Sequence, residues 1–130
     1  MQHAWWVGVV DDDASVRRAI ARFLRQHEIP VETFASAEDY LSNVLGVEPC
    51  CLILDIHLGG LSGFELQDYL TSHDIGVPVV FMTGHEEISA AQLAARAGTC
   101  GFLRKPFEGR ALLSLVGQHL PNVSLEHLSP

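Results

Sequence analysis

Polar side chains suited to a metal or phosphate site follow four of the apolar segments in this sequence. Asp11 and Asp12 come after the first segment, Asp55 after the third, Thr83 after the fourth and Lys105 after the fifth. Carboxylate oxygens without histidine or cysteine favour a hard cation, with Mg²⁺ as the leading candidate. A lysine ammonium suits a phosphoryl group in transfer. Together these residue types indicate a magnesium-dependent phosphoryl site.

The three carboxylates need a cation if they lie close together. Two like unit charges at ~4 Å repel by about 4 kcal/mol at an effective dielectric constant of roughly 20. Asp55 is the best candidate for a carboxylate nucleophile, because it follows the most apolar segment and no carboxylate adjoins it in sequence. Simpler readings are a turn residue for Asp55 and a surface lysine for Lys105. For Asp13 the simpler reading, a helix N-cap, is the one we favour.

Short apolar runs alternate along the chain with segments of helical periodicity. The runs predict strands at 5–10, 31–34, 50–54, 78–82 and 101–103. The spacing of apolar residues predicts helices within 16–24, 36–44, 62–70, 86–97 and 112–120. Ser36 with Asp39, and Ser62 with Glu65, have the spacing of capping boxes, so they mark the start of the second and third helices.

This alternation predicts an α/β domain with a five-stranded parallel sheet and helices on both faces. The third run is apolar at every position, as expected for a strand that is covered on both sides. Its first two residues, Cys50 and Cys51, are then expected to point to opposite faces. In a parallel sheet all strands end at one edge, where ligands bind. The sequence therefore predicts that the five polar residues named first meet at that edge.

Length and composition restrict the class of protein further. The 130 residues, of which 48 % are hydrophobic and 18 % charged, have the size and composition of one folded domain. The net charge of −8 argues against direct binding of nucleic acid, because DNA affinity depends on neutralising phosphates. No apolar run is long enough to predict a membrane helix. The three cysteines have neither metal nor disulfide spacing, and the sequence shows no export signal. We therefore expect the protein to be located in the reducing cytoplasm.

Four separated motifs resemble the receiver domain of bacterial two-component response regulators. They are the segments VDDDASVR at 10–17, LDIHLGGLSG at 54–63, MTGH at 82–85 and AGTCGFLRKPF at 97–107. The last two are most similar to regulators of the FixJ/NarL type. The resemblance implies a CheY-like (flavodoxin-like) fold, that is, a doubly wound (βα)5 domain with strand order 2-1-3-4-5. It assigns residues 1–120 to the receiver and 121–130 to a tail or to a linker that leads to a missing output domain.

The resemblance also implies a metal site around the phosphoacceptor. Asp55 is then the residue that is phosphorylated. Asp12 binds Mg²⁺ directly, and Asp11 binds it largely through water. The backbone carbonyl of His57 completes the site.

Further roles follow for the residues on the fourth and fifth strands. Thr83 is expected to bond a phosphoryl oxygen and to shift on phosphorylation, and Lys105 to pair with the phosphoryl group. Phe102 occupies the position of the switch aromatic, which is compatible with an ordinary core role. The peptide bond between Lys105 and Pro106 is often cis in the family.

Some residues depart from the family pattern. Gly59 stands where the family usually has proline, which predicts a looser loop and a less pre-organised metal site. Gly101 replaces the polar residue that is common before the switch aromatic. His57 and His85 occupy positions that tune the phosphoryl lifetime, and we expect exposed loop residues there rather than zinc ligands.

The function implied is a signalling module rather than an enzyme, apart from self-catalysed phosphorylation and dephosphorylation. A sensor histidine kinase donates the phosphoryl group. The acyl phosphate then switches the face formed by the segments 86–97, 101–103 and 112–120, which also offers a surface for a homodimer. The expected output is transcription, through a missing helix-turn-helix domain.

Other functions remain open at this stage. A single-domain receiver that relays phosphoryl groups or acts by protein contact fits the same residues. A small aspartyl phosphohydrolase is less favoured, because it needs a second carboxylate where this chain has His57. A flavodoxin-like cofactor binder is disfavoured as well, because Asp11 to Asp13 would repel a phosphate.

Overall fold

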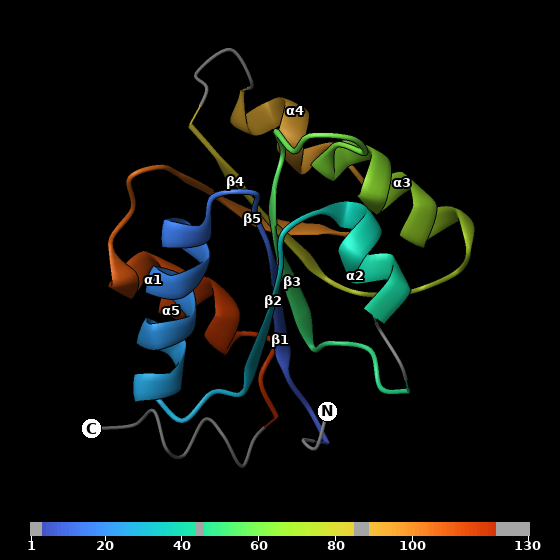
Figure 1. Ribbon diagram of the computed structural model, residues 1–130. Coiled ribbons are helices and arrows are strands. Elements are labelled where there is room, and N and C mark those ends of the chain that lie inside the picture. Colours follow the sequence, from blue (N-terminus) through green and yellow to red (C-terminus); the bar gives the residue numbers. More distant parts are fainter. Residues whose placement is uncertain (1–3, 44–45, 85–88, 122–130) are drawn as a thin grey trace.

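The computed structural model describes residues 4–43, 46–84 and 89–121. Strands and helices alternate throughout this part of the chain (Figure 1). The strands are β1 (Val7–Val10), β2 (Val31–Phe34), β3 (Cys51–Asp55), β4 (Val79–Thr83) and β5 (Thr99–Arg104). The helices are α1 (Ala14–Gln26), α2 (Ala37–Asn43), α3 (Gly63–Ser72), α4 (Ala90–Ala94) and α5 (Gly109–Gly117).

The five strands form one parallel sheet in the order β2-β1-β3-β4-β5, which confirms the predicted fold. Helices α1 and α5 cover one face, and α2, α3 and α4 cover the other (Figure 1). The central strand β3 is buried at all five positions, as its uninterrupted apolar run predicts. Ile53 packs in the core layer under α1 and α5, whereas Leu52 and Leu54 pack in the layer under α2 and α3.

Helices α1, α2 and α3 begin where their capping residues predict. The Asp13 carboxylate accepts a hydrogen bond from the first turn of α1 at 2.9 Å, so its N-cap role is confirmed. Ser62 and Glu65 form a complete capping box at the start of α3. At α2 the backbone N–H of Asp39 donates to Ser36 Oγ at 2.9 Å, but the Asp39 carboxylate accepts from the residue before Ser36. The capping box predicted for Ser36 and Asp39 is therefore only half formed.

The prediction that Cys50 and Cys51 point to opposite faces is wrong. Both side chains pack against the core layer under α1 and α5. The strand begins only at Cys51 and Cys50 lies in a bend, so the alternation of a strand does not extend to Cys50. Element ends also differ: α4 is shorter than the predicted 86–97, of which 86–88 lie outside the described residues, and α5 begins before residue 112.

A polar network joins α3 to the segment between α4 and β5. Gln67 is 3 % exposed; its Oε1 accepts a hydrogen bond from Arg96 Nε at 2.6 Å, and its Nε2 donates to Thr99 Oγ1 at 2.9 Å. The Arg96 guanidinium also donates to Asp68 Oδ1 at 2.7 Å and lies over the ring of Phe64. One arginine thus satisfies a buried amide and joins the segment between α4 and β5 to α3.

Replacing Arg96 by methionine is expected to lower the free energy of unfolding by roughly 1–3 kcal/mol. The variant keeps an apolar stem but leaves Gln67 Oε1 buried without its donor. Urea denaturation measures the change. Arg110→Met, which alters an exposed arginine of α5, serves as the control and should unfold like the wild type. Equal stability of the two variants would contradict the role of the network.

None of the helices in the described part of the chain has the length and apolar character needed to cross a membrane.

Candidate functional site

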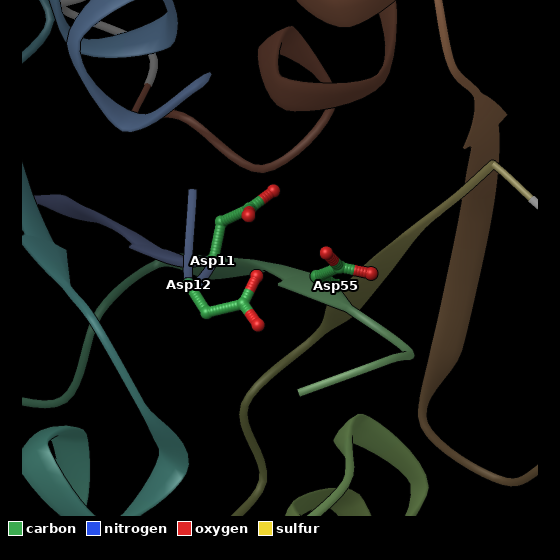
Figure 2. A group of neighbouring side chains, drawn as sticks. All are labelled: Asp11, Asp12 and Asp55. Carbon is green, nitrogen blue, oxygen red and sulfur yellow. The ribbon is translucent and has the colours of Figure 1, made fainter. Parts of the chain in front are cut away.

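The carboxyl edge of the sheet gathers the predicted polar residues. Asp11 and Asp12 follow β1, Asp55 is the last residue of β3, Thr83 is the last residue of β4, and Lys105 follows β5. Figure 2 shows the three carboxylates at the ends of two neighbouring strands. One oxygen from each of these carboxylates lies within 4.8 Å of the others. The structure therefore confirms the predicted acidic cluster: the three carboxylates lie close together.

Lys105 joins the two buried carboxylates. Its Nζ donates to Asp11 Oδ2 at 2.8 Å and to Asp55 Oδ2 at 3.0 Å. Asp11 is fully buried and Asp55 is 6 % exposed, whereas Asp12 is exposed. With three carboxylates and one ammonium, the formal charge of the cluster is −2. A divalent cation would neutralise this charge.

The remaining carboxylate oxygens are held by backbone N–H groups. Asp11 Oδ1 accepts from the N–H of Asp13 at 2.9 Å, and Asp55 Oδ1 accepts from the N–H of His57 at 3.0 Å. These bonds fix the orientation of both side chains at the strand ends. His57 itself is exposed, as expected for a loop residue. His85 lies outside the described residues.

The site shifts the pKa of both Asp55 and Lys105. Burial raises the pKa of Asp55 above its ordinary value, and the nearby Asp11 acts in the same direction. The hydrogen bonds from His57 and Lys105 oppose this shift without cancelling it. Burial alone would lower the pKa of Lys105, but the bonds to Asp11 and Asp55 outweigh it and raise the pKa. The Lys105 ammonium is therefore charged. At Asp55 the hydrogen bonds do not fully offset the cost of burying the negative charge.

The ends of β4 and β5 are connected beside the acidic cluster. The N–H of Lys105 donates to the backbone oxygen of Thr83 at 2.7 Å, which holds the two residues next to each other. Thr83 is fully buried. Phe102 is half-buried against the core layer under α2 and α3, with the Arg104 guanidinium 5.6 Å from the centre of its ring. The peptide bond between Lys105 and Pro106 is cis, as the family resemblance leads us to expect.

Sequence reasoning missed the role of Arg17. Its Nη1 donates to the backbone oxygen of Asp11 at 2.7 Å and so holds the turn that carries the acidic pair. The helical spacing puts Arg17 mostly opposite the apolar residues of this segment, a position that is typical of a solvent-facing side chain. A signal was present, because Arg17 lies four residues after the N-cap Asp13 and helical side chains point back toward the N-terminus.

Comparisons with known proteins agree with this geometry. The family described as "Response regulator receiver domain" matches residues 7–117. Nodulation protein W of Bradyrhizobium diazoefficiens is 38 % identical over 110 residues, which cover 85 % of this chain and 48 % of that protein. The transcriptional regulatory protein FixJ of Azorhizobium caulinodans is 33 % identical over 110 residues, covering 85 % of this chain and 52 % of FixJ.

Solved structures show the same similarity. The response regulator StyR superposes with a TM-score of 0.81 at 42 % identity, over 92 % of this chain and 60 % of StyR. The structure titled FixJ-N gives a TM-score of 0.77 at 30 % identity, over 93 % of this chain and 98 % of that one.

Fold and site together define a parallel α/β domain with an acidic, lysine-bridged pocket at the carboxyl edge of its sheet. The chain belongs to the family of response regulator receiver domains. It is thus a signalling domain of two-component systems rather than a conventional enzyme. The chain spans about half the length of the curated relatives that it matches.

Proposed function

We propose that this receiver accepts a phosphoryl group on Asp55 from a sensor histidine kinase, with Mg²⁺ in the acidic pocket. The observation that carries the proposal is the Lys105 ammonium, which contacts both Asp55 and Asp11 at 2.8–3.0 Å. Such a group is placed to neutralise oxygens that gain negative charge beside Asp55. The residues 1–120 are the proposed receiver, and 122–130 lie outside the described residues.

The donor set of the pocket fits Mg²⁺. Oxygens on one Mg²⁺ lie about 2.9 Å apart when adjacent and about 4.1 Å apart when opposite, given bonds of about 2.05 Å. The carboxylate oxygens of the cluster, within 4.8 Å of one another, leave room for such an ion and for water ligands. Asp12 and Asp55 would bind it, with the backbone carbonyl of His57. Asp11 would act largely through water, the role that the resemblance to receiver domains implies for it.

The reaction that we propose is an in-line transfer. A carboxylate oxygen of Asp55 attacks the phosphorus of a phosphohistidine, the P–N bond breaks, and its electron pair leaves with the histidine nitrogen. The Mg²⁺ would neutralise charge on the phosphoryl oxygens. Lys105 holds the acceptor oriented through Oδ2, and the N–H of His57 holds it through Oδ1. The same pocket would support self-catalysed phosphorylation by small phosphodonors and later hydrolysis.

The signal would leave the site through β4 and β5. The bond from the Lys105 N–H to the Thr83 oxygen couples the two strand ends. A phosphoryl group bonded by Thr83 would therefore act on β5, where Phe102 is half-buried. The α4-β5-α5 face is the proposed surface for switching and for a homodimer.

Several wider assignments rest on the relatives. Proteins such as FixJ and TdiR of Thauera aromatica are transcriptional regulators by name. We propose that this receiver likewise controls transcription through an output domain, and that the nucleic acid is contacted by that domain. Cys50, Cys51 and Cys100 are free thiols, in keeping with the proposed cytoplasmic location.

The test is phosphorylation by acetyl phosphate in the presence of Mg²⁺. We expect wild-type protein to gain the mass of one phosphoryl group, and Asp55→Asn and an EDTA-treated sample to gain none. Asp68→Asn, which changes an exposed carboxylate on α3, is the matched control and should be labelled normally.

Failure of the wild type to be labelled would overturn the proposal. Labelling that persists in Asp55→Asn would assign the acceptor to another residue. Sustained turnover of phosphate esters by the wild type would instead favour an aspartyl phosphohydrolase.

A further inference from the structure

The loop between β3 and α3 leaves the site with little intrinsic restraint. It covers residues 56–62 and carries His57, whose N–H holds Asp55. The loop contains Gly59 and Gly60 but no proline, and Gly60 has a positive φ of 76°. Its two ends meet where the N–H of Gly63 donates to the oxygen of Ile56 at 2.9 Å. This bond closes the base of the loop but does not hold its tip.

A side chain from α2 holds the tip of the loop. Glu38 Oε2 accepts a hydrogen bond from the backbone N–H of Leu61 at 3.0 Å, across 23 residues of sequence. The approach requires glycine at position 60, because a β-carbon there would lie 2.6 Å from the same oxygen. The bond from Leu61 lowers the pKa of Glu38, so the carboxylate is ionised at neutral pH and the bond is charge-assisted.

We propose that Glu38 is a positioning residue for the metal pocket. Its carboxylate restrains the loop that carries His57, and so supplies the stiffness that Gly59 and Gly60 lack. The inference rests on the proposed function, because the pocket is the Mg²⁺ site described above. Glu38 touches none of Asp11, Asp12 and Asp55 in the contacts of the described residues, and acts on the pocket only through the loop.

A purely local role for Glu38 predicts a different outcome. As an acidic residue in the first turn of α2, Glu38 also stabilises that helix through its dipole. Its loss would then change the stability of α2 without affecting ion binding. A positioning role instead predicts weaker binding of Mg²⁺ and a maximal rate that is recovered once Mg²⁺ is saturating.

The experiment compares the wild type, Glu38→Ala, Glu38→Gln and the control Glu32→Ala. Glu32 is an exposed glutamate of β2. Calorimetry measures Mg²⁺ affinity, amide hydrogen exchange measures protection of Leu61, and labelling by acetyl phosphate is followed at low and at saturating Mg²⁺. We expect Glu38→Ala to weaken Mg²⁺ binding by roughly fivefold, as expected for the loss of one hydrogen bond, and to expose the Leu61 amide. Glu38→Gln, which keeps a neutral acceptor, should lie between Glu38→Ala and the wild type.

Saturating Mg²⁺ should restore the labelling rate of Glu38→Ala to that of the wild type. The inference is overturned if Glu38→Ala binds Mg²⁺ as Glu32→Ala does, or if the Leu61 amide of the wild type is unprotected. If the wild type itself binds no Mg²⁺, the proposed function fails. If the wild type and Glu38→Ala bind Mg²⁺ with equal affinity, only the inference about Glu38 fails.

Discussion

Lys105→Met is expected to slow phosphorylation by acetyl phosphate about 10²–10³-fold, the usual effect of removing one group that stabilises developing negative charge. The ammonium is the group that contacts both buried carboxylates. Methionine keeps an apolar stem of similar length but offers no hydrogen-bond donor. Labelling rates at saturating Mg²⁺ measure the effect. Arg18→Met, a change of an exposed arginine on α1, serves as the control.

The same variant should unfold more easily without Mg²⁺. Breaking a buried ion pair by removing one partner costs about 3–5 kcal/mol, and the lower end applies because the Lys105 side chain is 25 % exposed. Mg²⁺ should restore part of this stability, because it supplies the missing positive charge. Urea denaturation with and without Mg²⁺ tests both statements. A stability equal to that of the wild type in metal-free buffer would contradict the role of Lys105.

The raised pKa of Asp55 makes one contribution to the dependence of stability on pH. The folded state holds the Asp55 proton more tightly than the unfolded state, whose pKa is close to the ordinary 3.8. The stabilising contribution of this group is therefore present at low pH and is lost as the pH rises through the pKa of the folded state. Without Lys105 the pKa of Asp55 should rise further, and the loss should extend to higher pH. Unfolding measured across acidic pH in metal-free buffer shows the shift.

Gly63→Ala is expected to destabilise the domain by at least about 1–3 kcal/mol, the usual cost of forcing extra atoms into packed structure. A β-carbon at position 63 would clash with the backbone oxygen of Asp55 and would lie 2.9 Å from the Cα of Ile56. Neither group is the end of a flexible side chain, so α3 or the end of β3 must move.

The backbone movement caused by Gly63→Ala should also slow phosphorylation. A β-carbon at position 63 would meet the backbone of Asp55, the proposed phosphoacceptor, and a misplacement of about 1 Å can reduce rates by about 10²-fold. We therefore expect both lower stability and slow labelling by acetyl phosphate. Gly117→Ala is the matched control, because no atom lies within 4 Å of a β-carbon built there. A Gly63→Ala variant that is as stable and as active as Gly117→Ala would show that the strand end tolerates the shift.

The sequence alone predicted the order of the elements and the identity of the polar residues at the strand ends. Apolar runs and caps such as Asp13 and Ser62 are local signals, because a helix start or a buried strand depends on neighbouring residues. Parallel strands then place Asp11, Asp55 and Lys105 at one edge, whatever the details of packing. The acidic cluster was predictable for this reason.

The ends of elements and the supporting contacts were not predictable in the same way. Lys105 lies 94 residues from Asp11, and Leu61 lies 23 residues from Glu38. Whether such side chains touch depends on helix placement and side-chain conformation, which no local pattern records. The sequence therefore determined which groups meet at the edge of the sheet. Only the tertiary structure decided that Lys105 bridges two buried carboxylates and that Glu38 holds the loop after β3, because these bonds join segments that are brought together by packing.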